Sequence, residues 1–130
     1  MLISSRDQWV SWWGPVVAYM AGIFFMSSLD SPPVPSDVPD VSLHAAAYIG
    51  LMLLAVRALA QGTWAHVTFG VLASAWILTV AYGATDEWHQ LHVEGRHAEW
   101  RDLIADALGA LAGGIVVRAW LFLRRRQPTS

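Results

Sequence analysis

Four long apolar runs, separated by short polar segments, set the pattern of this chain. Each run is about 20 residues long, which is the length that a helix needs to cross the hydrocarbon core of a bilayer. The runs cover residues 9–29, 41–60, 64–84 and 103–123. Little sequence remains for a soluble domain. The pattern therefore predicts an all-α membrane protein, a four-transmembrane-helix bundle that forms a single domain over residues 1–130, with a polar loop at 85–102.

The composition agrees with this class and excludes several others. Among 130 residues, 55% are hydrophobic and only 14% are charged, which lies outside the range of soluble domains. The chain has no cysteine, so disulfides and thiolate sites are excluded. The first run is too long for a secretory signal, and Asp7 weakens a basic leader, so we expect this run to remain as a helix. The arginines at 124–126 suit a helix-end anchor, and no nucleic-acid partner is expected.

The arginines predict which way the bundle lies in the membrane. With four spans, both termini share one side. That side holds six of the eight basic residues, namely Arg6, Arg57, Arg118, Arg124, Arg125 and Arg126. The other side holds two arginines and nine of the ten acids, for a formal charge of −7 against +5 on the first side. Since short cytoplasmic loops carry the excess of arginine and lysine, both termini are expected in the cytoplasm.

Polar residues with helical spacing occur where three of the runs meet the other, outer side. His44 and Tyr48 lie four residues apart at the start of the second run. Asp86 and Gln90 repeat this spacing after the third run, with Gly95 expected to end that helix. Residues four apart share one face of a helix, so each pair is expected to point in one direction.

The fourth run begins with the same spacing. Asp102 and Asp106 lie four residues apart, and Asp106 is the deeper of the two. A charged carboxylate inside a span costs about 3 kcal/mol, so Asp106 needs compensating neighbours. Below it, Gly109 and Gly113 form a GxxxG spacing that lets another helix approach, and the alanines at 45–47 offer a matching small surface.

Packing of these three helices would collect the polar side chains around one outward-opening pocket. The predicted ligand-binding residues are His44, Tyr48, Asp86, Glu87, Gln90, Arg96, Asp102 and Asp106. The alternative is a structural cluster, in which Arg96 pairs with Asp106 or Asp86 and His44 donates to a carboxylate. The remaining loop charges, Glu94, Glu99 and Arg101, are expected to be solvated.

Three stretches of sequence resemble the VanZ-like family of small bacterial membrane proteins. Family members carry DKxxHxxxY, then DExHQxFxPGR, then DxxxN or DxxxD followed by xxG. The matching stretches here are DVSLHAAAY at 40–48, DEWHQLHVEGR at 86–96 and DLIADALG at 102–109. Val41, His92 and Glu94 depart from the common Lys, Phe and Pro. The resemblance implies a multi-pass protein of the bacterial plasma membrane with an envelope role, because the founding member is associated with low-level teicoplanin resistance.

Two classes of function remain open on this basis. The first is binding or modulation of an amphiphile at the outer surface, with membrane lipids, a lipoglycopeptide or a lipid-linked cell-wall intermediate as partner. The second is a membrane enzyme that acts on a lipid-linked headgroup, with Asp86 or Glu87 as general base and His44 or His89 as acid. Crowded carboxylates cannot all ionise comfortably, so one could carry a proton near neutrality, but no nucleophile is evident.

Metal binding and transport are the remaining possibilities. No cofactor is predicted, although His89 and His92, three residues apart and next to acids, are weak candidates for divalent-metal ligands. A proton-coupled transporter is disfavoured, because four helices are few and no ionisable residue lies at the middle of a span. The oligomeric state is not determined by the sequence.

Overall fold

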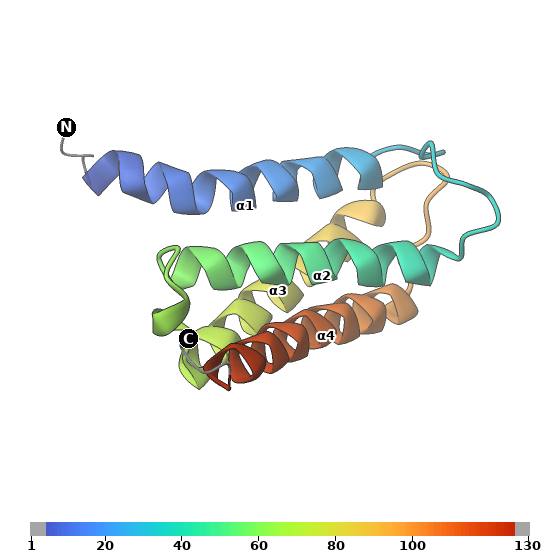
Figure 1. Ribbon diagram of the computed structural model, residues 1–130. Coiled ribbons are helices and arrows are strands. Elements are labelled where there is room, and N and C mark those ends of the chain that lie inside the picture. Colours follow the sequence, from blue (N-terminus) through green and yellow to red (C-terminus); the bar gives the residue numbers. More distant parts are fainter. Residues whose placement is uncertain (1–4, 127–130) are drawn as a thin grey trace.

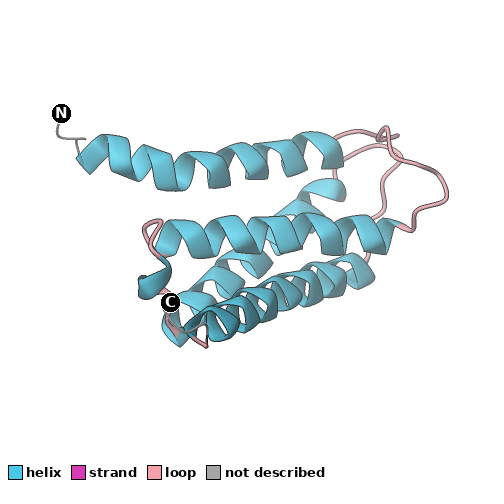
Figure 2. Ribbon diagram, viewed as in Figure 1, coloured by secondary structure: helices cyan, strands magenta, loops and turns pink. Residues whose placement is uncertain are grey.

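The computed structural model describes residues 5–126, which form four long α-helices joined by loops (Figures 1 and 2). The helices are α1 (Ser5–Ser27), α2 (Asp40–Leu59), α3 (Phe69–Gln90) and α4 (Trp100–Arg125). All four are long and apolar enough to cross a membrane. The described residues contain no strand. The all-helical, four-span prediction is therefore confirmed.

Successive helices run in opposite directions. The start of α1 and the end of α4 lie at one end of the bundle, and the α1–α2 and α3–α4 loops lie at the other (Figure 1). We call the second end, formed by residues 28–39 and 91–99 with the adjoining helix ends, the polar end.

The third helix differs from its predicted bounds of 64–84. It begins at Phe69, because the Thr68 side chain accepts a hydrogen bond from Val71 N (3.2 Å) and caps the helix there. The segment Trp64–His66 is a short 3₁₀ turn instead. At the other end α3 continues to Gln90, as the spacing of Asp86 and Gln90 indicates.

The loop predicted at 85–102 is consequently shorter, and only residues 91–99 are non-helical. The prediction that Gly95 ends the third helix was wrong, since the helix already ends at Gln90. Gly95 serves the following turn, where its φ of +79° is a conformation that favours glycine.

Small residues bring α2 and α4 into backbone contact, as the GxxxG spacing predicts. A Cβ placed at Gly109 would collide with the carbonyl oxygen of Ala45. One turn further, a Cβ at Gly113 would lie 3.2 Å from the carbonyl oxygen of Ile49. Of the three alanines expected on this surface, Ala46 is exposed instead.

Helix α1 packs mainly along α2 and is tied there by polar contacts (Figure 1). Pro15 lacks an N–H, so the carbonyl of Ser11 has no helical partner, and Arg57 Nη1 of α2 donates to it at 3.0 Å. Tyr19 Oη donates to the Ala47 carbonyl at 3.0 Å. These contacts hold α1 beside α2 without burying most of its surface, and the exposed apolar side chains suit contact with lipid tails.

Candidate functional site

Six ionisable or amide side chains are buried where α2, α3 and α4 meet at the polar end. They are His44, Asp86, Glu87, Gln90, Asp102 and Asp106. Two helical turns supply most of them, because Asp86, Glu87 and Gln90 lie in the last turn of α3 and Asp102 opens α4. Burial of so many carboxylates is costly, so their partners define what the site can do.

His44 joins α2 to α4. Its Nδ1 hydrogen-bonds to Asp106 Oδ1 at 2.9 Å, and Asp106 is completely buried. The same Nδ1 lies 3.9 Å from Glu87 Oε1 of α3. The other oxygen of Glu87 accepts from the backbone N–H of Glu99 at 3.2 Å. Two carboxylates from two helices therefore face one imidazole nitrogen.

A second contact joins α1 to α3. Ser27 Oγ donates to Asp86 Oδ1 at 2.6 Å. Gln90 Nε2 lies 3.4 Å from the other oxygen of Asp86, one helical turn away. Asp86 is thus held from the end of α1, which the sequence did not connect with the site.

Several buried polar atoms of the site have no hydrogen-bond partner among the described residues. They are the Tyr48 hydroxyl, Glu87 Oε1, Arg96 Nε and Asp106 Oδ2. Gly83 makes room for two of these groups, because a Cβ there would lie 2.8 Å from Asp106 Oδ2 and 3.1 Å from Tyr48 Cε1. Buried polar atoms are normally paired, so unpaired ones concentrated in one place point to a ligand, an ion or water.

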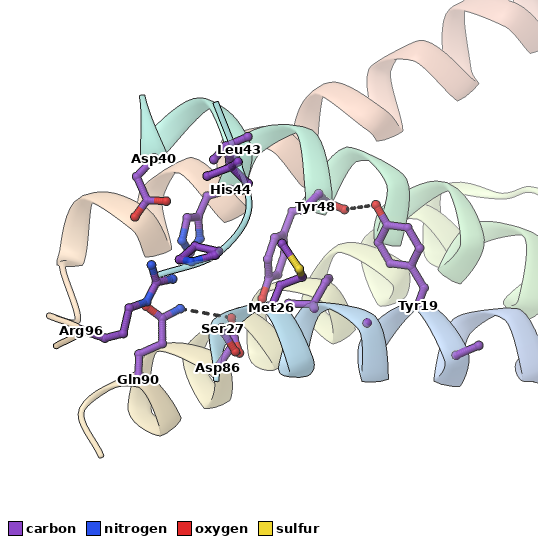
Figure 3. Close-up of a pocket in the computed structure, with 16 residues that line it drawn as sticks. Tyr19, Met26, Ser27, Asp40, Leu43, His44, Tyr48, Asp86, Gln90 and Arg96 are labelled. Carbon is purple, nitrogen blue, oxygen red and sulfur yellow. Dashed lines mark hydrogen bonds between the residues drawn. The ribbon is translucent and has the colours of Figure 1, made fainter. Parts of the chain in front are cut away.

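A cavity of about 470 Å³ lies between α1 and α2 and reaches the polar end. Its apolar wall comes mostly from α1 and α2 and includes Gly22, Ile23 and Ala47. Figure 3 shows Asp40, His44, Gln90 and Arg96 gathered at one end of the cavity, with Tyr19 toward the other. The cavity is therefore amphipathic along its length.

The eight predicted binding residues fall into two sets. One set lines this cavity, and the other forms a buried cluster around His44, which we call the ion cluster. The cavity lining contains five of them, namely His44, Tyr48, Asp86, Gln90 and Arg96. The other three are Glu87, Asp102 and Asp106, which gather around His44 in groups of potential ligand atoms. His44 is the residue common to both sets. The solvated charges expected at Glu94, Glu99 and Arg101 are indeed exposed.

Arg96 has a different environment from the one considered in the sequence. In the part of the chain that the structure describes, His44 rather than Arg96 makes the close contact with Asp106. Arg96 lines the cavity, and its Nε is buried without a hydrogen-bond partner. Arg96 thus has a donor in this part of the structure that no described residue uses.

The weak metal candidates lie outside the groups that bring three potential ligands together. The His89 ring stacks on Phe24, with centroids 4.2 Å apart. His92 Nδ1 donates to the Trp88 carbonyl at 3.0 Å. Within residues 5–126, the two groups of three whose ligand atoms lie within 4.8 Å of one another are Asp40, His44 and Asp102, and His44, Glu87 and Asp106.

Sequence reasoning missed the contribution of α1 to the site. Ser27 contacts Asp86, and Tyr19 and Met26 line the cavity. The available signal was topological, because the end of the first span must lie on the same side of the bundle as the start of the second. The apolar run alone gave no reason to choose Ser27 over Ser28.

The fold and the site together define a multi-pass membrane protein with an amphipathic cavity and a buried acid–histidine cluster at one end of its bundle. The model of the VanZ/LLP1 family matches residues 12–123, and the chain belongs to this family. The resemblance seen in the sequence is thereby confirmed. Comparison with curated proteins and with solved structures gave no match.

Proposed function

We propose that this protein binds an amphiphile of the bacterial envelope in the cavity between α1 and α2. The ligand is a lipoglycopeptide such as teicoplanin or a lipid-linked cell-wall intermediate, with its head at the polar end and its tail along the helices. The polar end faces the outside of the plasma membrane, and both termini lie in the cytoplasm. The observation that carries the proposal is an apolar cavity that ends at an unpaired arginine.

Arg96 is the residue expected to hold the head of the ligand. It is the only arginine or lysine in the cavity lining, and its Nε has no partner among the described residues. A guanidinium binds phosphate or carboxylate oxygens through two parallel hydrogen bonds. Asp40 and Asp86 border the same end and are suited to amines, which lipoglycopeptides also carry.

The remainder of the cavity suits an apolar chain. The wall formed by Ala18, Gly22 and Ile23 of α1 faces Leu43 and Ala47 of α2. Its volume of about 470 Å³ lies within the usual range of ligand sites, roughly 300 to 1,000 Å³. Because both helices have the length and composition of membrane spans, a tail in this cavity could remain continuous with the lipid phase.

Removing the Arg96 guanidinium should weaken binding. Purified protein in lipid nanodiscs is titrated with teicoplanin, and lipids that copurify are identified by mass spectrometry. Arg96→Ala should lower affinity for the ligand about tenfold or more, since a hydrogen bond to a charged group contributes about 1.5 to 3 kcal/mol. Arg101→Ala is the matched control, because Arg101 is an exposed arginine at the same end of the bundle. Equal affinities for wild type and Arg96→Ala would refute the assignment of the head site.

A second candidate is an acid–base enzyme that acts on the headgroup of a lipid-linked substrate. It is favoured by the contacts of Ser27 with Asp86 and of His44 with Asp106, which place a hydroxyl and an oriented imidazole at one cavity. Asp86→Asn should then abolish turnover of a bound lipid while leaving Arg96-dependent binding in place. The readout is the mass of the bound lipid before and after incubation. Unchanged lipid in the wild type would leave binding as the function.

A further inference from the structure

We propose that His44, Glu87 and Asp106 bind a divalent metal ion, with Zn²⁺ and Mn²⁺ as the best matches to their chemistry. The three ligand atoms come from α2, α3 and α4 and all lie within 4.8 Å of one another. The site is distinct from the pair His89 and His92 that the sequence suggested.

The separations of the ligand atoms suit a common ion. His44 Nδ1 lies 2.9 Å from Asp106 Oδ1 and 3.9 Å from Glu87 Oε1. Nitrogen and oxygen ligands bound to one ion at about 2.1 Å are about 3 to 4 Å apart. One imidazole and two carboxylates form a mixed set, which zinc accepts and manganese also tolerates.

Unpaired acceptors in the cluster supply an independent indication of a cation. Glu87 Oε1 and Asp106 Oδ2 have no hydrogen-bond partner in the described chain, and the two residues are only 8% and 0% exposed. A single Nδ1–H of His44 cannot serve both carboxylates, and at 3.9 Å it does not reach Glu87. A metal ion would satisfy both acids at once, in exchange for the Nδ1 proton.

The surroundings hold these ligands in place. The backbone N–H of Glu99 fixes Glu87 Oε2 at 3.2 Å, which leaves Oε1 on the side of His44. Gly83 leaves the space that the Asp106 carboxylate occupies. Such supporting contacts orient ligands before the ion arrives.

The charges around the cluster also favour a cation. Asp102 of α4 is buried, and its carboxylate groups with Asp40 and His44 within 4.8 Å. Asp86 of α3 lies at the same end, and Arg96 is the cationic side chain that borders it. Asp40 and Asp102 thus lie beside His44, and three of these four further charged groups at this end of the bundle are acids.

The test uses the full chain, purified in detergent and stripped with a chelator. Zn²⁺ and Mn²⁺ are then titrated separately by calorimetry, and the bound metal is counted by elemental analysis. The wild type should bind one ion, and Glu87→Gln should lower the affinity at least tenfold. Glu99→Gln and His92→Ala are the controls and should bind like the wild type, because both side chains are exposed and outside the cluster.

Two further readouts keep the proposal falsifiable if Glu87→Gln does not fold. The metal should raise the unfolding temperature of the wild type. Co²⁺ bound to the wild type should show the visible absorption of an ordered site with nitrogen ligation. The site would be overturned if neither Zn²⁺ nor Mn²⁺ bound stoichiometrically. It would also be overturned if folded Glu87→Gln bound the metal with the same affinity as the wild type. The metal site and the amphiphile site are tested independently, because Arg96→Ala should still bind the metal but no longer bind the amphiphile.

Discussion

The contact between Gly109 and Ala45 determines how closely two charged side chains can approach. Ala45 follows His44 on α2, and Gly109 lies one turn after Asp106 on α4. A Cβ at Gly109 would meet the Ala45 carbonyl, so the missing side chain permits the separation at which His44 Nδ1 and Asp106 Oδ1 hydrogen-bond. At the residue scale, a glycine thus positions the ion cluster without touching it.

Gly109→Ala should therefore destabilise the bundle. The added methyl group forces α2 and α4 apart, and overpacking of this kind costs about 1 to 3 kcal/mol. Chemical denaturation in detergent, followed by circular dichroism, measures the effect. Gly22→Ala is the control, because nothing lies within 4 Å of a Cβ at Gly22. A midpoint for Gly109→Ala equal to that of the wild type would show that the contact is not close in the folded protein.

Helix α1 forms one wall of the cavity and packs against α2, with Val16 as its buried apolar side chain. Two polar contacts also attach α1 to α3. Tyr82 Oη donates to the Met20 carbonyl at 2.6 Å, and Ser27 reaches Asp86 at the polar end. One cluster of buried apolar residues joins α2, α3 and α4, and a second joins α1 to α2 through Val16, Tyr48 and Leu51. At the element scale, α1 therefore both packs against α2 and supplies residues to the cavity lining.

Filling the cavity from α1 should block the ligand without harming the fold. Gly22→Trp places a large side chain where nothing lies within 4 Å of the Cβ position. We expect this variant to lose binding of teicoplanin or copurifying lipid. Its free energy of unfolding should stay within about 1 kcal/mol of the wild-type value, since no packed group is displaced. The control is Phe25→Trp, on an exposed part of α1 outside the cavity lining. Undiminished binding in Gly22→Trp would place the ligand elsewhere.

The distribution of charge over the whole molecule predicts its orientation in the membrane. The arginines near the start of α1, the end of α2 and the end of α4 collect at one end of the bundle. Nine of the ten acids collect at the polar end, together with the cavity and the buried cluster around His44. Because positive charge is retained on the cytoplasmic side, we predict that the polar end faces outward.

Cysteine labelling in intact cells measures this orientation, since the chain has no cysteine of its own. A membrane-impermeant maleimide should label Glu94→Cys in the α3–α4 loop and leave Gln61→Cys in the α2–α3 connection unlabelled. Both positions are exposed and lie at opposite ends of the bundle. Labelling of Gln61→Cys alone would reverse the orientation and place the cavity on the cytoplasmic side.

Patterns within each helix were sufficient to predict the helices and to predict which site residues share a helix face. The four spans, the continuation of α3 to Gln90 and the close approach at Gly109 all follow from spacing within one helix, because helical geometry is the same in any protein. The start of α3 was placed wrongly, since the composition of 64–68 is apolar enough for a span and only the cap at Thr68 excludes it.

The sequence by itself determined how many helices are long and apolar enough to cross a membrane, which end carries the polar residues and which of these share a helix face. Tertiary structure alone decided that His44 pairs with Asp106, that Arg96 lines the cavity and that Ser27 of α1 holds Asp86. The physical reason is that spacing along a helix fixes relative directions within that helix. Which side chain faces which across helices depends on how each helix is rotated and how closely it packs, and these follow from contacts between residues far apart in the chain.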